Sequence, residues 1–414
     1  MRHLKASGHD VIGAGRGVEA SRRRLPRFPW VHADLRRTTA ADWAGLLIGV
    51  DAVVNAAGSL QDGLGDDMTA VHIEGLGTLI EGCRQAGVHH LVHISAVGVT
   101  PGRGGSFNET KAKGEAVVRA SGLDWTILRP ALVMASQAYG GGALLRGLAS
   151  FPFVIPAIAV NSAVQTVGID VLSQAVVAAV EGRSGSGQTL ELAGAETLPL
   201  AELLQRLRAW LGLPPAPVIE IPGPLIGVVS LAADGLGRLG WRSAMRSNAV
   251  DQQTKGMHSP GGGEATLGLP AQTLDEILDA MPSNLQERRF ARLYFVKPAV
   301  LILLGLFCAY SGILGLTAGY DAAIGMLAAG GVASPLKEVL LIGGCIADIL
   351  LAMGLLVRRS APLALKGIIA ISLAYLVAGS WLRPDLWLDP LAALAKAGAV
   401  AMLALVGLAM MDER

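Results

Sequence analysis

Apolar residues are distributed differently in the two parts of this chain. Up to about residue 290, short apolar runs alternate with polar and charged segments, as in a water-soluble domain. Beyond residue 298, Leu, Ala, Gly, Val and Ile dominate four runs of about 20 residues, near 298–317, 337–357, 361–382 and 390–411. A helix of that length matches the ~30 Å hydrocarbon core of a bilayer. We therefore predict an all-α domain of four transmembrane helices over 298–411.

The hydrophilic part repeats a rhythm of strands and helices. Apolar runs bounded by turn residues predict strands at 10–16, 30–35, 51–58, 89–95 and 124–130. Segments of helical period lie between them, around 67–86 and 108–121. This alternation predicts an α/β fold, a doubly wound parallel sheet with helices on both faces. Ligands on such sheets bind at the carboxyl ends of the strands.

Composition and charge narrow the function classes. The formal net charge of +1 gives no reason to expect nucleic acid as a partner, and the mean hydropathy of +0.48 comes from the C-terminal runs. The three cysteines have no paired spacing, so we expect neither a disulfide framework nor a zinc site. His89 and His93 would point to one face of a strand and His90 to the other, so we expect no metal site.

Basic residues predict the orientation of the membrane domain. Arg288, Arg289, Arg292 and Lys297 precede the first run, and Arg358 and Arg359 separate the second from the third. The positive-inside rule then places the N-terminal domain and the C-terminus in the cytoplasm. Asp348 falls near the middle of the second run, and Lys396 in the fourth is its candidate partner. The pair is either a structural interhelical contact or a proton or ligand site.

Several residues in the hydrophilic part carry a family resemblance. Their order resembles that of the atypical extended short-chain dehydrogenase/reductases, of the NmrA-like branch that includes the accessory Rossmann subunit of respiratory complex I; they are Asp34-Leu35, Asn55-Ala56-Ala57-Gly58, Ser95, Lys111 and Leu128-Arg129-Pro130. The C-terminal runs resemble a DoxX-like membrane domain. The resemblance implies a Rossmann-like NAD(P)-binding domain over 1–165 and a smaller substrate or partner lobe over 166–290.

The resemblance also implies roles for matching residues. Arg16 would meet an adenosine 2′-phosphate, which favours NADP over NAD. Asp34 and Leu35 would contact the adenine, Lys111 would hydrogen-bond the nicotinamide ribose, and the turn beside the cofactor would be Asn55, Ala56, Ala57 and Gly58. From the residues alone, the turn is equally a tight strand exit and Lys111 an exposed helix residue.

This sequence departs from the family at its beginning. The family opens with a strand and a Gly-rich turn that holds the pyrophosphate at a helix N-terminus. Residues 1–9 instead align with the end of the first helix, so the first strand and the Gly-rich loop are missing from the pattern. We expect a hydrophobic gap in the sheet. Either translation starts further upstream, or tight dinucleotide binding has been lost.

The second departure concerns catalysis. Catalytic family members carry a Tyr four residues before the Lys, and this phenol transfers the proton that accompanies hydride transfer. Here that position is Phe107, although Ser95 and Lys111 remain as candidate catalytic residues. Tyr139 is the candidate replacement phenol, although a Tyr beside three glycines is more typical of a turn.

Two functions fit these observations. The first is a membrane-anchored NAD(P)-binding module for nucleotide sensing or assembly, with impaired classical catalysis. The second is an NADP-dependent oxidoreductase or isomerase acting on a lipophilic, quinone-like or isoprenoid-like substrate. Both imply membrane lipids as partners, together with a membrane protein or a lipophilic small molecule.

Overall fold

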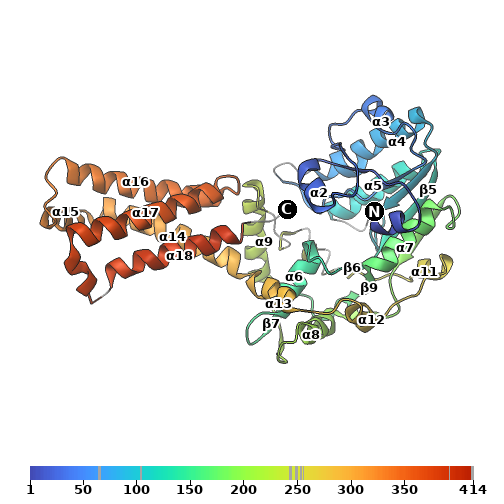
Figure 1. The fold of residues 1–414 in the computed structure, drawn as a ribbon. Helices are drawn as coiled ribbons and strands as arrows, with labels where there is room; N and C mark the ends of the chain where they lie inside the picture. The colour runs from blue at the N-terminus through green and yellow to red at the C-terminus, as the bar shows by residue number, and fades with distance from the viewer. Residues whose placement is uncertain are drawn as a thin grey trace. The chain divides into compact units, whose positions relative to one another are not determined.

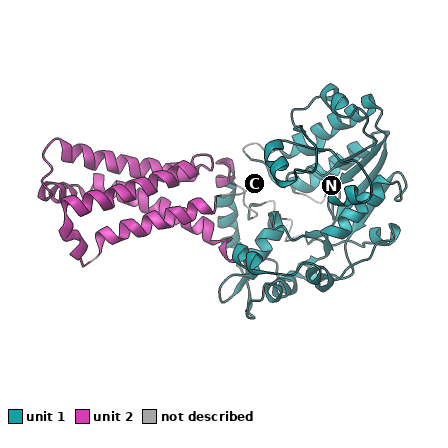
Figure 2. Ribbon diagram, in the orientation of Figure 1, with its two compact units in different colours: residues 1–234, 243–291 teal, residues 235–242, 292–414 magenta. Residues whose placement is uncertain are grey.

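The chain forms two compact units in a computed structural model. The structure describes residues 1–63, 67–102, 105–241, 245–247, 250–251, 254, 256–390 and 392–411. The first unit comprises Met1–Asp234 with Ser243–Ala291, and the second Gly235–Arg242 with Arg292–Arg414 (Figure 2). The unit boundary near residue 291 lies just before the first predicted membrane span.

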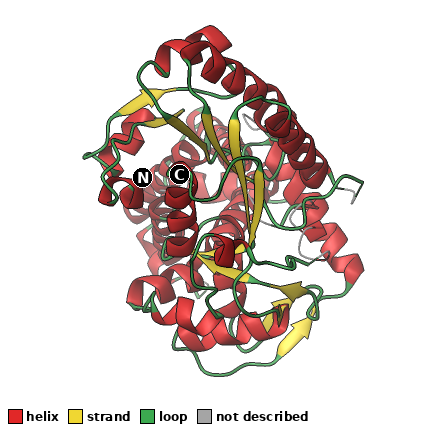
Figure 3. Ribbon diagram, turned by 90° about the vertical axis from the view of Figure 1, so that its right-hand side faces the viewer, coloured by secondary structure: helices red, strands yellow, loops and turns green. Residues whose placement is uncertain are grey.

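A four-stranded sheet forms the centre of the first unit. The strands run in the order β10-β5-β4-β3, and every neighbouring pair is parallel (Figure 3). Their bounds are β3 Ala52–Asn55, β4 His90–Ile94, β5 Asp124–Pro130 and β10 Gln188–Leu192. The predicted Rossmann-like α/β fold is confirmed, and the predicted strands at 51–58, 89–95 and 124–130 are those of the sheet.

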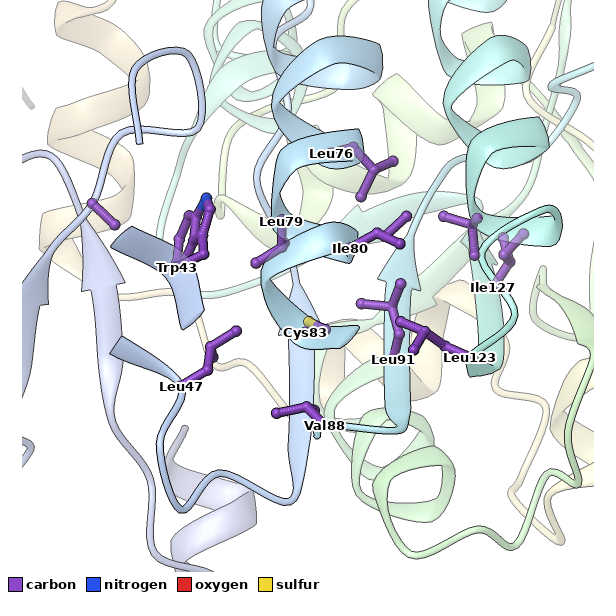
Figure 4. Close-up of a cluster of buried hydrophobic side chains, with 12 residues drawn as sticks. Trp43, Leu47, Leu76, Leu79, Ile80, Cys83, Val88, Leu91, Leu123 and Ile127 are labelled. Carbon is purple, nitrogen blue, oxygen red and sulfur yellow. The ribbon is translucent and has the colours of Figure 1, made fainter. Parts of the chain in front are cut away.

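Helices cover both faces of this sheet. On one face, α4 (Gly75–Ala86) and α5 (Ser106–Arg119) pack on Leu91 and Ile127. The next residue in each strand, Val92 or Leu128, packs on α7 (Ile169–Val180) across the other face. Figure 4 shows the first of these two cores, with Leu79 and Ile80 of α4 among the strand side chains.

Helix α3 (Ala40–Leu46) packs closely on α4. A capping box between Thr39 and Asp42 begins α3. A Cβ atom at Gly82 of α4 would lie 2.3 Å from the Cβ of Trp43, so only glycine permits this approach. Trp43 therefore reaches the core beside Leu79 (Figure 4).

The first two predicted strands form a sheet of their own. β1 (Gly13–Gly15) and β2 (Trp30–His32) pair in parallel, and among the described residues neither pairs with β3. The side chains of β3 are only half-buried before Asn55, whereas Leu91 and Val92 of β4 are fully buried. β1 and β2 therefore form a pair separate from the four-stranded sheet.

The remaining elements of the first unit are short. A π-helical turn, η1, precedes α4. Small parallel and antiparallel pairs join the segment that follows β5 to later parts of the unit. The bounds are α1 Arg2–Ala6, α2 Val18–Arg24, η1 Ala70–Glu74, β6 Leu132–Met134, α6 Gly140–Ala149, β7 Ile155–Ala157, β8 Ala163–Val164, β9 Thr166–Gly168, β11 Leu198–Pro199, α8 Leu200–Trp210, β12 Val218–Glu220, α9 Gly223–Arg238, α11 Gly263–Thr266, α12 Leu274–Asp279 and α13 Leu285–Leu293 (Figure 1).

The second unit is a bundle of apolar helices. Three helices of the described chain are long and apolar enough to cross a membrane: Leu285–Leu316, which contains α14 (Val296–Leu316), α16 (Leu336–Leu356) and α17 (Ala361–Leu382). The fourth predicted span forms α18 (Ala393–Ala409), a shorter helix of 17 residues. Two short elements lie between them, α15 (Tyr320–Ala329) and η2 (Pro384–Leu388). Leu304, Leu365 and Ala404 lie in the bundle core.

The predicted partnership of Asp348 with Lys396 is not formed. The Ser311 hydroxyl of α14 donates a hydrogen bond to Asp348 Oδ2 at 2.8 Å, and Lys396 is exposed. The reason is the packing order. α16 packs on α14 and α17, whereas α18 packs mainly on α17 and α14. Asp348 is therefore buried against α14, away from the face of α18 that carries Lys396.

Candidate functional site

The exit turn of β3 is fixed by the side chain of Asn55. Its Oδ1 accepts a hydrogen bond from the Ala57 backbone N–H at 3.1 Å, and its Nδ2 lies 3.1 Å from His93 Nδ1. Because the amide Nδ2 can only donate, His93 accepts at Nδ1 and carries its proton on Nε2. Burial and the Lys111 charge lower the pKa of His93 to about 3, so it is neutral. The turn places Gly58 near Lys111, with 3.5 Å between an ideal Cβ and Nζ.

Lys111 is buried at the carboxyl end of β4. Its ammonium donates a hydrogen bond to the Ile94 carbonyl at 3.1 Å, and the residue is only 5% exposed. Burial lowers the pKa of Lys111 to about 8, although the nearby Glu115 carboxylate acts in the opposite direction. Lys111 is therefore mostly protonated at neutral pH and loses its charge within the accessible pH range.

A buried carboxylate organises the side of the site opposite the β3 turn. Ser95 Oγ donates to Glu115 Oε1 at 2.6 Å, and Arg129 donates to both oxygens of Glu115, at 2.9 and 2.7 Å. Arg119 adds a hydrogen bond at 2.7 Å. Burial would raise the pKa of Glu115, but these donors hold it below its ordinary value. A hydroxyl has one proton, so Ser95 has only lone pairs left for a ligand.

The position of the missing phenol borders a neutral histidine. Phe107 makes an edge-on ring contact with His72, with 5.9 Å between ring centroids. Nε2 of His72 accepts a hydrogen bond from the Ser59 N–H at 3.0 Å, and Nδ1 lies 2.9 Å from the Thr110 hydroxyl. Burial, with a smaller effect of the Lys111 charge, lowers the pKa of His72 to about 3. Both ring nitrogens are thus engaged, and His72 holds the loop after β3 to α5.

The predicted adenine side lies along a separate surface depression. Arg16 follows β1, and Asp34 follows β2; both line a depression of about 910 Å³ together with Arg36 and Arg37. Arg36 forms a 2.6 Å ion pair with Asp34, and this hydrogen-bonded pair lowers the Asp34 pKa to about 2. Leu35 packs against the core under α4. The structure therefore brings Arg16 and Asp34 to one basic depression and turns Leu35 away from it.

Tyr139, the candidate replacement phenol, and His90 both lie outside this constellation. Tyr139, at the start of α6, is largely exposed. His90 makes a hydrogen bond to the Ala179 carbonyl of α7, on the opposite face of the sheet from His93. Within the described residues no cluster of His, Cys, Asp and Glu could hold a metal ion.

Sequence reasoning missed Glu115 and His72. Glu115 follows Lys111 by one helical turn, so the spacing alone puts both side chains on one face of α5. That signal was available, but the partners of Glu115 come from β5 and the end of β4, which only the fold brings together. His72 lies inside a segment predicted as helix, where nothing distinguishes it from a surface residue.

The donors and acceptors suit the ribose end of a dinucleotide. Lys111 supplies N–H groups, and Ser95 supplies lone pairs, which together match a sugar hydroxyl that both accepts and donates. His93 Nε2–H is a buried donor with no partner in the described part of the chain. A cofactor bound here would supply a hydride, and Lys111, Ser95 and His93 would hold and orient its ribose.

Comparisons with known proteins find family matches in both parts of the chain. Residues 1–164 match an NAD(P)H-binding family, and residues 305–406 match a DoxX-like family. The NADH-ubiquinone oxidoreductase 40 kDa subunit of Neurospora crassa mitochondria is 26% identical over 202 residues, 49% of this chain and 48% of that protein. The chain thus spans about half the length of this curated relative.

Solved structures show the same fold at low identity. A nucleoside-diphosphate-sugar epimerase from Staphylococcus aureus has a TM-score of 0.53 at 16% identity, covering 67% of this chain and 93% of that one. A UDP-glucuronic acid 4-epimerase from Bacillus cereus, solved with UDP-glucuronic acid and NAD, has a TM-score of 0.52 at 17% identity, covering 70% and 93%. Residues 1–164 are therefore similar to an NAD(P)H-binding family, and the solved structures share the fold of this region. Residues 305–406 are similar to a DoxX-like family, and both matches agree with the predicted resemblance.

Proposed function

We propose that this membrane-anchored protein binds a nicotinamide dinucleotide as a sensing or assembly module, without proton-coupled hydride transfer. One observation carries the proposal: neither the residue at the family's Tyr position nor Ser95 can donate a proton to a substrate. Phe107 has none to give, and the Ser95 proton is directed to Glu115. The loss of one general acid lowers rates by roughly 10²–10⁴-fold. The similarity to an NADH-ubiquinone oxidoreductase subunit supports a role beside a membrane partner.

Nucleotide titration of the full chain tests the proposal. We would follow NADH and NADPH fluorescence with the protein in lipid nanodiscs, comparing Lys111→Met with Lys113→Met, an exposed position on the same helix. Loss of a charge-assisted hydrogen bond corresponds to about 1.5–3 kcal/mol, so Lys111→Met is expected to weaken binding by about 10- to 100-fold. Unchanged affinity in Lys111→Met, or no binding by the unmodified protein, would overturn the proposal.

We propose that the nucleotide is NADP and not NAD. Arg16 and Arg37 lie at the depression described above, where a 2′-phosphate would find positive charge. Arg16→Gln is expected to weaken NADPH binding by about tenfold and to leave NADH binding unchanged. Arg23→Gln, on the nearby helix α2, is the matched control. Equal losses for both nucleotides would contradict the assignment.

A second candidate function is supported by Lys111 itself. An ammonium with a pKa of about 8 can donate a proton at neutral pH, in place of the absent phenol. The chain would then be an NADP-dependent oxidoreductase or isomerase acting on a lipophilic, quinone-like or isoprenoid-like molecule from the bilayer. NADPH consumption with short-chain quinones and enones tests this. The rate is expected to fall as pH rises through about 8, and Phe107→Tyr is expected to raise it.

We propose that the N-terminal unit and the C-terminus face the cytoplasm of a bacterial inner membrane. Basic residues at the start of α14 and between α16 and α17 support this orientation. Reporter fusions at the C-terminus and in the loop between α17 and α18 distinguish the two orientations. Cytoplasmic activity of the loop fusion would reverse the assignment.

A further inference from the structure

Helix α9 exposes a face of apolar side chains. The helix runs over Gly223–Arg238 and belongs to both units, since its last four residues, from Gly235 to Arg238, are in the second (Figure 2). Leu231 is 75% exposed and Val228 is 67% exposed, although a soluble helix would bury such residues. The complete face, including the residue that follows the helix, is Leu225, Val228, Val229, Leu231, Leu236 and Leu239.

The buried face of α9 is the polar one. Ser230 and Ala233 are buried, and Asp234 accepts hydrogen bonds from Arg246 Nε at 2.9 Å and from the Ser247 hydroxyl. Asp234 and Arg238 are the two charged residues of α9, whose residues are all described. Asp234 is turned toward the protein, and Arg238 lies at the end of the helix. Apart from Arg238 at its end, the exposed face therefore carries aliphatic side chains, in the reverse of the usual arrangement for a helix facing water.

The residues that follow α9 are attached to the end of a membrane span. The Leu239 carbonyl accepts a hydrogen bond from the Arg358 N–H at 3.1 Å, and Trp241 Nε1 donates to the Leu356 carbonyl at 2.7 Å. The Arg358 guanidinium lies 5.7 Å from the centre of the Trp241 ring. Leu356 is the last residue of α16, and α17 begins at Ala361.

This attachment fixes the depth of the C-terminal end of α9. Helices α16 and α17 have 21 and 22 residues, so each crosses the ~30 Å hydrocarbon core and the turn between them lies at the boundary with water. Trp and Arg are typical of that boundary. Leu236 and Leu239 are thus held at the level where acyl chains meet headgroups, and the exposed apolar face is continuous with them along the helix.

We propose that the apolar face of α9 docks on the lipid bilayer that the bundle crosses, as an interfacial helix inserted at the boundary between headgroups and acyl chains. Leu225, Val228 and Leu231 enter the acyl region, while Asp234 stays with the protein. Such a helix binds through apolar area and nearby basic residues. Arg238 and Arg358 supply the positive charge at its end.

A lipid-quenching experiment on the full chain in nanodiscs tests the proposal. Leu231→Cys carries an environment-sensitive bimane probe, and Ile48→Cys, 80% exposed after α3, is the matched control. The three native cysteines are buried, and labelling of the unmodified protein gives the background. We expect blue-shifted emission at position 231, quenched by about half or more with lipids brominated along the acyl chain, and little quenching at position 48.

Two further results decide between occupants of the face. Adding Val228→Asp to the Leu231→Cys protein is expected to reduce the quenching, while an unchanged melting temperature shows that the protein remains folded. Blue-shifted emission without quenching by brominated lipid would mean that protein covers the face, either a second copy or another segment. Water-like emission would mean that nothing covers it. Either result overturns the proposal.

Discussion

Glu115 in α5 and Asp348 in α16 are both buried acidic residues, but their surroundings differ. Glu115 accepts hydrogen bonds from Ser95, Arg119 and the Nε and Nη2 groups of Arg129. Asp348, in the described chain, accepts one hydrogen bond, from Ser311. The first group is compensated in charge and in hydrogen bonding, whereas the second has a single neutral donor.

The difference separates a structural carboxylate from one that retains binding capacity. A buried charge whose donors are all arranged contributes order, and removing it leaves its partners uncompensated. A carboxyl group inside a membrane bundle with one donor has lone pairs left for a proton or a polar ligand group. The fold of the first unit should therefore depend on Glu115 far more than the bundle depends on Asp348.

The largest expected effect is at Glu115. Glu115→Ala removes the buried carboxylate, leaves the partly buried Arg129 with Glu191 as its remaining partner, and is expected to lower the free energy of unfolding by about 3 kcal/mol. Urea titration of the full chain in nanodiscs, followed by tryptophan fluorescence, measures it. Glu81→Ala removes an exposed pair with Arg84 and is expected to change stability by no more than about 1 kcal/mol. Equal losses in the two variants would mean that the buried Glu115 network stabilises the fold no more than an exposed ion pair does.

Lys111 beside Glu115 gives an intermediate, pH-dependent effect. Its pKa is lowered from 10.5 to about 8 on folding, so between these values the unfolded chain binds more protons than the folded one. Stability contributed by this residue therefore rises as pH increases from about 8 to 10.5, by up to about 3 kcal/mol. Unfolding midpoints across this range measure the rise. It should disappear in Lys111→Met, and an identical slope in that variant would show that other groups cause it.

The smallest effect is expected at Asp348. Asp348→Asn keeps an acceptor for Ser311, and interhelical hydrogen bonds in membranes are worth about 0.6 kcal/mol on average. The free energy of unfolding of the bundle, measured by thermal unfolding in nanodiscs, is expected to change by less than about 1 kcal/mol. Lys396→Met, at an exposed residue that does not pair with Asp348, is expected to have no effect. A loss at Asp348 as large as that at Glu115 would mean that both carboxyl groups are structural.

The sequence predicted elements better than the contacts between them. Period and composition located β3, β4 and β5, because buried parallel strands leave short apolar runs with clear ends. The three long membrane helices could also be predicted from the sequence, since their length follows from bilayer thickness. The short length of α18 could not be predicted, because the ends of a helix within an apolar run depend on local backbone geometry.

The candidate site was predicted only in part. Asn55, Gly58 and Lys111 were expected near one another from the family resemblance, and the structure brings them together. The hydrogen bond that Ser95 donates could not be predicted, because its acceptor, Glu115, lies 20 residues further along the chain. The error about Lys396 has a similar origin: depth along a helix can be read from sequence, whereas the direction in which a residue faces depends on which helices are neighbours.

The separation of the β1–β2 pair leaves β3 as the terminal strand of the main sheet. One side of its backbone pairs with β4, and among the described residues no strand pairs with the other side. An open ladder of N–H and C=O groups is a template for any extended peptide. The side chains of Ala52, Val53 and Val54 are small and uncharged, and Val53 and Val54 pack toward the two cores, so no charge on these three residues repels an incoming chain. Self-association at high concentration is therefore expected to begin at this edge.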